Sequence, residues 1–474
     1  MSREICPECN QEYDGYWCKP CNSKHFQNDF NNWTSGNDKI DKFIQDTQPN
    51  ANNRYEVIEW IPYNRFKDVK QIGKGGFGTI HYARWIDGYI DKWDIKNKRW
   101  KRKRDWKVAL KKFDNFVDFN DVLNEMEIHL KIYFEFYHAS IRFYGITQDP
   151  ETHSYMMVLE YAKDGNLREY LKLNFDNINW EQKLENLSLL SLNLRDIHEL
   201  DIVHQDFHPG NILSSSFKFN DIKISDFGLS KLIGVNPNNL DKKNIFGVLP
   251  YIAPEVLSGD EDYTKAADVY SFGIIAYEMI TGFPPYSDIP HDKDLAMKIC
   301  NGLRPKIPFH TPKLITRMIM RCWDARVTHR PTFTELKDEL WKYYKDYRDK
   351  DSEIRIQIEN PEKLSKNLGL INSTTPTPLN YQTHPQAIYT SRLLNFSKLS
   401  KPKNEENFER ELEELTKSMS NLCPRNNNKG NMNLSQNRLS QQDFLHSSSN
   451  SRNELLKEAV PFFLIQSFSV NDEY

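Results

Sequence analysis

Two neighbouring stretches decide the fold: IVHQDFHPGNIL, residues 202–213, and ISDFGLS, residues 224–230. Asp206 precedes Asn211 by five residues, and Asp226 follows fifteen residues later, after an apolar run typical of a strand. Phosphoryl transfer needs oxygens of these kinds. One carboxylate orients a hydroxyl and accepts its proton, while an amide oxygen and a second carboxylate hold magnesium ions. We predict these roles for Asp206, Asn211 and Asp226 in that order, on their joint spacing, because a single Asp or Asn is more often a turn residue or helix cap.

A glycine-rich segment lies upstream, in IGKGGFGTI, residues 72–80, which has the pattern strand, tight turn, strand. Its spaced glycines are Gly73, Gly75 and Gly78. Side chains there would hold the backbone away from a triphosphate, whereas glycines let the amide groups close over it. Such turns are common, so this signal is weak alone.

A lysine downstream strengthens the prediction that the glycine-rich segment binds phosphate. The run Val108-Ala109-Leu110-Lys111 ends in a side chain that can meet the α- and β-phosphates as a compact charge, although an ordinary edge-strand lysine would look the same.

Glu125 is predicted to hold Lys111 by an ion pair. It follows the lysine by fourteen residues, inside VLNEMEIHLKI, a segment with helical periodicity. Glu127 is the competing partner. We favour Glu125 because the neighbouring apolar residues would then define the buried side of the helix; these are Leu123, Met126 and Leu130.

In order and spacing, these residues resemble the protein kinase family from about Phe66 to Tyr344. The run Tyr251-Ile252-Ala253-Pro254-Glu255 is similar to the end of the family's activation segment, and Asp268 to the buried aspartate that opens a central helix. The resemblance pairs Arg330, in CWDARVTHRPTF, with Glu255. It implies an α+β, bilobal protein kinase fold, with a β-rich N-lobe, a helical C-lobe and ATP bound with Mg²⁺ between them.

The same resemblance implies an adenine site at a hinge near residues 160–162. Leu159 would be the gatekeeper, Glu160 would begin the hinge, and Ala162 would offer backbone hydrogen bonds to adenine. The residues implied to sandwich the ring are Ile72, Ile80, Ala109 and Leu213. The segment EYAKDGNLREYL is most similar to the tyrosine-kinase-like branch, whose members mostly phosphorylate serine and threonine. The expected partners are therefore protein substrates.

Three positions depart from the family pattern: Gln205 replaces an arginine, His208 a lysine and Val248 a threonine. These departures put the choice of acceptor hydroxyl in doubt, although serine and threonine remain favoured over tyrosine. They also leave open an ATP-binding pseudokinase that acts as a scaffold. Because Gln205 cannot supply charge-assisted pairing to a phosphate, we expect activity to be independent of activation-loop phosphorylation.

The amino end carries CPECNQEYDGYWCKPC, in which Cys6, Cys9, Cys18 and Cys21 form two Cys-x-x-Cys pairs. Four thiolates at this spacing can converge on Zn²⁺, and a segment too small for its own core would then fold on the metal. Redox-active or free cysteines are the alternative. We expect His25 to lie outside the metal's ligand shell and the module to be separable from catalysis. It could recruit a protein partner.

Residues 84–107 combine four tryptophans with many lysines and arginines. The favoured interpretation is an elongated hairpin whose tryptophans pack on one side while the charges stay in water. Binding of nucleic acid or anionic lipid, and a basic import signal, are the alternatives.

Composition divides the 474 residues into a four-cysteine, zinc-ribbon-like module and linker at 1–50, a catalytic domain at 66–346, and a low-complexity, mostly disordered C-terminal tail at 351–474. Within the tail, 405–422 has the periodicity of an amphipathic helix, either solvated or docking a partner. A net charge of -3 makes nucleic acid an unlikely overall partner. The sequence shows neither a signal peptide nor a membrane span, and its cysteines form no disulfide framework, so we expect a location in the cytoplasm or nucleus.

Overall fold

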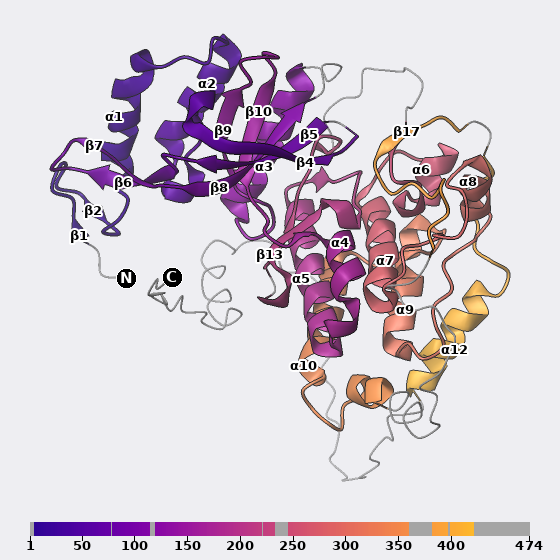
Figure 1. Ribbon diagram of the computed structural model, residues 1–474. Coiled ribbons are helices and arrows are strands. Elements are labelled where there is room, and N and C mark those ends of the chain that lie inside the picture. The colour runs from indigo at the N-terminus through magenta and orange to yellow at the C-terminus, as the bar shows by residue number, and fades with distance from the viewer. Residues whose placement is uncertain are drawn as a thin grey trace, which may run out of the picture. The chain divides into compact units, whose positions relative to one another are not determined.

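The computed structural model describes residues 4–76, 78–113, 119–219, 221–232, 245–359, 382–396 and 399–420. The β-rich N-lobe and the helical C-lobe expected from the sequence are both present (Figure 1). In the described part of the chain, no helix is long and apolar enough to cross a membrane.

The N-lobe is built on a six-stranded sheet in the order β3-β9-β10-β8-β5-β4. Its strands are β3 (Glu59–Trp60), β4 (Phe66–Lys74), β5 (Gly78–Trp85), β8 (Trp106–Phe113), β9 (Phe143–Gln148) and β10 (Tyr155–Glu160). Helix α3 (Phe119–Glu135) buries its apolar side in the same core as residues of β9 and β10. The glycine-rich segment forms the end of β4, the start of β5 and the turn between them.

The amino-terminal segment consists of strands β1 (Glu4–Ile5) and β2 (Glu12–Tyr13), followed by helices α1 (Lys19–Asp29) and α2 (Asp38–Thr47). Asn37 caps α2 by accepting hydrogen bonds from the backbone N–H groups of Lys39 and Ile40. Ile40 and Ile44 are one turn apart and fully buried, in the same apolar cluster as Val122 and Met126 of α3. The second half of this segment is therefore part of the N-lobe core, a contact that composition does not reveal.

The basic stretch forms the expected hairpin, with strands β6 (Tyr89–Asp94) and β7 (Arg99–Lys103) paired antiparallel. Trp93 stacks on His25, with ring centroids 3.8 Å apart. Trp100 stacks on Phe26 at 4.5 Å. The hairpin tryptophans thus pack against the amino-terminal segment.

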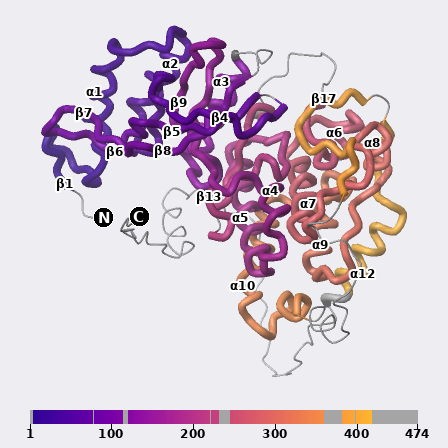
Figure 2. The backbone as a smooth tube through the Cα atoms, in the orientation of Figure 1, coloured from indigo at the N-terminus to yellow at the C-terminus, as the bar shows by residue number. Residues whose placement is uncertain are grey.

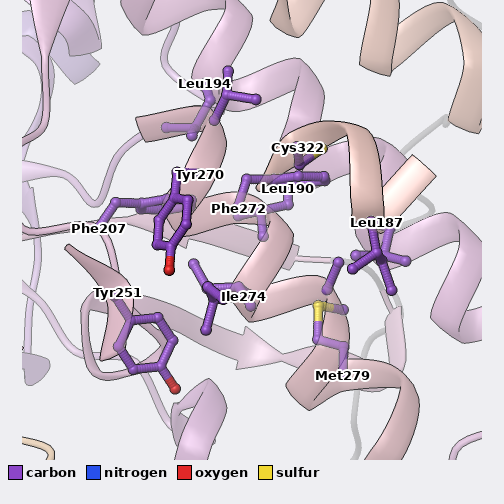
Figure 3. Close-up of a cluster of buried hydrophobic side chains, with 14 of the residues drawn as sticks. Leu187, Leu190, Leu194, Phe207, Tyr251, Tyr270, Phe272, Ile274, Met279 and Cys322 are labelled. Atoms are coloured by element: carbon purple, nitrogen blue, oxygen red, sulfur yellow. The ribbon is translucent and has the colours of Figure 1, made fainter. Parts of the chain in front are cut away.

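The C-lobe core lies between α5 (Trp180–Glu199) and α7 (Lys265–Thr281), and Figure 3 shows Leu187, Leu190 and Leu194 of α5 with Tyr270, Phe272 and Ile274 of α7. The lobe also contains the helices α4 (Leu167–Asn174), α6 (Pro254–Ser258), α8 (Lys293–Cys300), α9 (Lys313–Cys322) and α10 (Phe333–Asp346), and a helical stretch at 353–359. Two small sheets border the site: β11 (Gly165–Asn166), β13 (Ile212–Ser216) and β14 (Asp221–Ile224) form one, and β12 (Ile202–Val203) and β15 (Lys231–Leu232) the other.

Part of the stretch interpreted as tail packs on the C-lobe. Strand β17 (Arg392–Leu394) pairs antiparallel with β16 (Ile245–Gly247), and helix α12 (Phe408–Ser420) packs against α9. In Figures 1 and 2 these orange and yellow elements lie beside the C-lobe helices. The helix expected at 405–422 begins at Phe408; the side chain of Met419 and the whole of Leu422 lie outside the described residues, as do residues 360–381 and 423–474.

Candidate active site

Lys111 is at the centre of the candidate site. Its Nζ lies 2.5 Å from Glu125 Oε1 and 2.8 Å from Asp226 Oδ1. Lys111 and Glu125 are 4% and 2% exposed, so both ionised groups are out of water and depend on each other for compensation. Glu127, the competing partner, is exposed. The structure therefore brings together three residues that span 115 positions of the sequence.

Burial and charge act in opposite directions on this cluster. Burial alone would lower the pKa of Lys111, but the carboxylates of Asp226 and Glu125 raise it. Burial raises the pKa of Glu125 to about 6, although Lys111 opposes the shift. Burial would also raise the pKa of Asp226, yet the charge and hydrogen bond of Lys111 hold it below its usual value. The lysine and Asp226 thus keep their charges near neutral pH.

Hydrogen bonds to Asp268 hold the turn that carries Asp206. The buried Asp268 carboxylate accepts hydrogen bonds from the backbone N–H groups of His204 (2.9 Å) and Gln205 (3.2 Å). Gln205 has a φ of 67°, a left-handed conformation that costs free energy in a residue other than glycine, and these bonds stabilise it. The turn sets the backbone from which the Asp206 side chain projects.

Asn211 is tied to that turn, since its Nδ2 donates to the backbone carbonyl of Asp206 at 2.9 Å. With the amide nitrogen used in this way, its amide oxygen is left to face a cation. Asp226 follows β14 with a φ of 64°. Amide and carboxylate oxygens are the ligands that Mg²⁺ prefers, so Asn211 and Asp226 fit the group expected there.

His208 lies next to the Asp206 carboxylate. Its Nδ1 accepts the backbone N–H of Gly210 at 3.0 Å, so the ring proton of the neutral imidazole is on Nε2. Nε2 is 3.5 Å from Asp206 Oδ2. Burial would raise the pKa of Asp206, but His208 and the Ser391 hydroxyl hold it below its usual value. A donor therefore stands beside the carboxylate where the family pattern has a lysine.

Aromatic rings connect the two lobes behind the site. Phe227 packs edge-on against His129 of α3, with centroids 4.8 Å apart, and lies 5.2 Å from His204. His129 is fully buried, and its two ring nitrogens lack hydrogen-bond partners among the described residues. Burial, with a smaller contribution from the nearby Lys111, therefore lowers the pKa of His129 to about 3. This neutral ring acts as an apolar spacer between α3 and the Asp226 turn.

The residues implied to sandwich adenine are all at least partly exposed, as expected for the lining of an open site; they are Ile72, Ile80, Ala109 and Leu213. Ala162 is partly exposed too, whereas Leu159 is buried in the N-lobe core. Glu160 accepts two hydrogen bonds of 2.8 Å from Lys223 Nζ. Its side chain thus fixes the end of β10 to β14, below the hinge.

Two further expectations concern the activation segment. Arg330 and Glu255 form a bidentate ion pair, with both N···O distances 2.7 Å and both side chains buried. The Ser230 hydroxyl is buried and donates to the carbonyl of His204 at 3.0 Å. The Tyr251 hydroxyl lies between Arg168 and Glu278. Both hydroxyls are therefore used in folding; residues 233–244 of the loop lie outside the described residues.

Sequence reasoning missed Gly76 and Ser391. The Ser391 hydroxyl donates a short hydrogen bond to Asp206 Oδ2 and lies 3.3 Å from His208 Nε2. A Cβ added to Gly76 would lie 2.4 Å from the carbonyl oxygen of Ser391. Nothing in the sequence distinguishes Ser391 from the other serines of its polar surroundings, because its position depends on how β17 docks. Gly76 was within the quoted glycine-rich segment but not singled out.

The four amino-terminal cysteines converge, with all four Sγ atoms within 4.8 Å of one another. Cys6 Sγ and Cys21 Sγ are 3.7 Å apart, and Cys9 Sγ and Cys18 Sγ 3.5 Å. Tetrahedral zinc with Zn–S bonds of about 2.3 Å needs edges of about 3.8 Å, so the thiols fit this ion. His25 instead contacts Glu8 Oε2 at 3.1 Å.

Known proteins match the part of the chain that carries this site. Residues 66–340 match the family model described as protein tyrosine and serine/threonine kinase. The chain is 27% identical to "Probable serine/threonine-protein kinase pats1" of Dictyostelium discoideum, over 60% of this chain and 8% of that protein. It is 28% identical to tyrosine-protein kinase SPK-1 of Girardia tigrina (57% and 52%) and 27% identical to dual specificity protein kinase pyk3 of Dictyostelium discoideum (64% and 20%). This chain thus spans about half or less of the length of these relatives.

Proposed function

Because the chain belongs to the protein tyrosine and serine/threonine kinase family, we propose that it transfers the γ-phosphate of ATP to hydroxyl groups of proteins. The observation that carries this proposal is the buried cluster in which Lys111 bridges Glu125 and Asp226. A lysine held in this way offers a fixed positive charge to the α- and β-phosphates.

The reaction divides among the remaining residues. Asp206 orients the acceptor hydroxyl and accepts its proton, and Asn211 and Asp226 supply oxygens for magnesium. Magnesium, when bound, neutralises charge on the phosphates. His208 Nε2–H points toward the region between Asp206 and the acceptor, where it can donate to a phosphate oxygen. The glycines at 73, 75, 76 and 78 let the backbone close over the phosphates.

Serine and threonine are the proposed acceptors, rather than tyrosine. Serine is the residue whose hydroxyl meets Asp206 in this structure, and its backbone fits directly under the glycine-rich turn. The distance from backbone to hydroxyl is much shorter in serine than in tyrosine, so an acceptor backbone in this position suits the shorter side chain.

Phosphate transfer from labelled ATP to a random-sequence peptide library tests the proposal. Purified full-length protein should label serine and threonine peptides, and Asp206→Asn should lower the rate at least about a hundredfold. If wild type and Asp206→Asn both bind ATP and neither transfers phosphate, the alternative holds: the chain is an ATP-binding pseudokinase that acts as a scaffold.

We also propose that Cys6, Cys9, Cys18 and Cys21 hold a structural zinc ion. The support is the matching sulfur geometry and the small apolar content of this segment, which needs a metal to fold. Elemental analysis of freshly purified, reduced protein should find about one zinc per chain. Cys18→Ala should lose that zinc and expose Trp17, whereas Cys322→Ala, at a buried cysteine of α9, should keep it. A metal-free wild type would refute the site.

Zinc would give the amino-terminal segment a rigid surface for a protein partner, and the cytoplasm or nucleus is the proposed location, since free thiols persist there.

A further inference from the structure

Residues 382–396 lie along the C-lobe and contact Asp206, the proposed catalytic aspartate. Pairing of β17 with β16 sets the register, with Gly247 opposite Arg392 and Ile245 opposite Leu394. Ser391, the residue just before β17, thereby reaches Asp206, and its hydroxyl donates a hydrogen bond to the Asp206 carboxylate.

Contacts on both sides of Ser391 hold the segment. Before it, the backbone carbonyls of Gln386 and Ile388 meet His291, each at 2.9 Å. The Tyr389 carbonyl accepts from Arg168 at 3.2 Å, and the Tyr389 hydroxyl donates to the carbonyl of Pro285 at 2.8 Å. These bonds use the backbone and the Tyr389 side chain, and they hold the residues just before Ser391 against the C-lobe.

After Ser391, two side chains hold the segment. Arg392 donates to the carbonyl of His291 at 2.5 Å. Leu394 is 4% exposed and packs into the C-lobe core. Thr390, the neighbouring hydroxyl residue, is exposed and shows no such contact. Of the two adjacent hydroxyls, the structure presents only one to the carboxylate.

We propose that Ser391 is a phosphoacceptor of this chain's own catalytic site, delivered in cis by residues 382–396. The inference rests on the proposed function. Three observations carry it: the hydroxyl donated to Asp206, the strand register that holds it there, and the fit of the Ser391 backbone beneath Gly76.

The reaction balances without any further reactant. Ser391 Oγ attacks the γ-phosphorus of ATP, the bond from that phosphorus to the β,γ-bridging oxygen breaks, and ADP leaves. The hydroxyl proton passes to Asp206, already its hydrogen-bond acceptor. The products are phosphoserine, ADP and one proton.

Phosphorylation then works against the docked state. Phosphoserine carries a charge of about −2 near neutral pH, and it would lie beside the Asp206 carboxylate, with Asp226 nearby. Like charges in a buried site repel strongly, so the modified segment leaves and the site opens to other substrates. External substrates should share the features that hold the segment. We expect an arginine directly after the acceptor serine, as at Arg392, and an apolar side chain three residues after that serine, as at Leu394.

The test measures phosphate on Ser391 and on a random serine peptide library in the same reaction, using full-length protein. Wild type should label Ser391 at a fractional rate that stays constant over about a hundredfold range of protein concentration, because the acceptor is tethered. Thr390→Ala should match wild type. Leu394→Asp, which undocks β17, should lower Ser391 labelling about tenfold or more while library labelling persists. Arg392→Ala is the second undocking variant, should Leu394→Asp fail to fold.

Each outcome has a distinct meaning. Library labelling without phosphate on Ser391 overturns the inference and leaves the proposed function intact, and higher library labelling in Leu394→Asp would then identify the segment as an inhibitor only. A fractional rate that rises with protein concentration overturns delivery in cis. Absence of label on both acceptors overturns the proposed function and the inference together.

Discussion

The amino-terminal helix α2 should control catalysis through helix α3. Ile44 is fully buried and shares an apolar cluster with Met126, the residue next to Glu125. Replacing Ile44 with alanine removes buried methyl and methylene groups and leaves a cavity on the face of α3, at a cost of about 2–5 kcal/mol. Because α3 carries Glu125, loosening this face should also weaken the ion pair with Lys111.

Ile44→Ala should lower the melting temperature by about 5–15 °C and reduce kcat/KM for a serine peptide. Ile95→Ala is the matched control, since Ile95 is 44% exposed at the turn between β6 and β7. Its free energy of unfolding should change by no more than about 0.5 kcal/mol. Thermal unfolding and steady-state kinetics on both variants decide the matter: equal stability of Ile44→Ala and Ile95→Ala would refute the coupling.

The same contact bears on truncation. Deletion of residues 1–50 removes Ile40 and Ile44 together, and so should destabilise the N-lobe by more than either single replacement. Deletion of residues 1–34 removes the four cysteines and keeps α2. The packing of α2 therefore argues against the expectation that the whole of 1–50 is separable, and places the better boundary before residue 35.

Three further outcomes are expected. Lys111→Met and Asp226→Asn should each fold normally and lose at least about a hundredfold in phosphate transfer, measured with labelled ATP, and near-normal turnover in either would refute the site. His129 has its pKa lowered to about 3 from 6.5, so its contribution to stability is complete above pH 6.5 and is lost as pH falls. Wild type should therefore lose about 2 kcal/mol more than His129→Leu between pH 6.5 and 5, measured by urea unfolding. Ser230→Ala should leave library labelling within about twofold of wild type, because the Ser230 hydroxyl is buried against a backbone carbonyl; a large loss traced to a missing phosphate on Ser230 would contradict this.

The grouping of the candidate catalytic residues could be predicted because the chemistry expected of them constrains their spacing. Asp206 and Asn211 lie close together before β13, and Asp226 follows the hairpin of β13 and β14, so their separation along the chain is short and limited by local geometry. The choice of Glu125 over Glu127 could also be predicted, since only one of two residues placed two apart on a helix can face the core beside Lys111.

The docking of residues 382–396 and 399–420 could not be predicted in the same way. Composition measures whether a stretch can bury its own apolar side chains, and this stretch is too polar to form a core. It packs instead by adding a few apolar side chains, Leu394 and Phe408 among them, to a core that already exists. Its backbone bonds are to distant partners such as His291 and Cys300, which no local pattern identifies.

Control by the flanking segments follows from how the activation segment is held. Gln205 offers no positive charge to a phosphorylated loop, and the hydroxyls of Ser230 and Tyr251 are already bound inside the fold. We therefore expect the loop to work without the phosphate switch that an arginine at position 205 would supply. Both flanking segments are tied to elements of the site: α2 shares an apolar cluster with α3, the helix that carries Glu125, and β17 pairs with β16 of the activation segment. We therefore expect a change in either contact to alter catalysis without any modification of the loop.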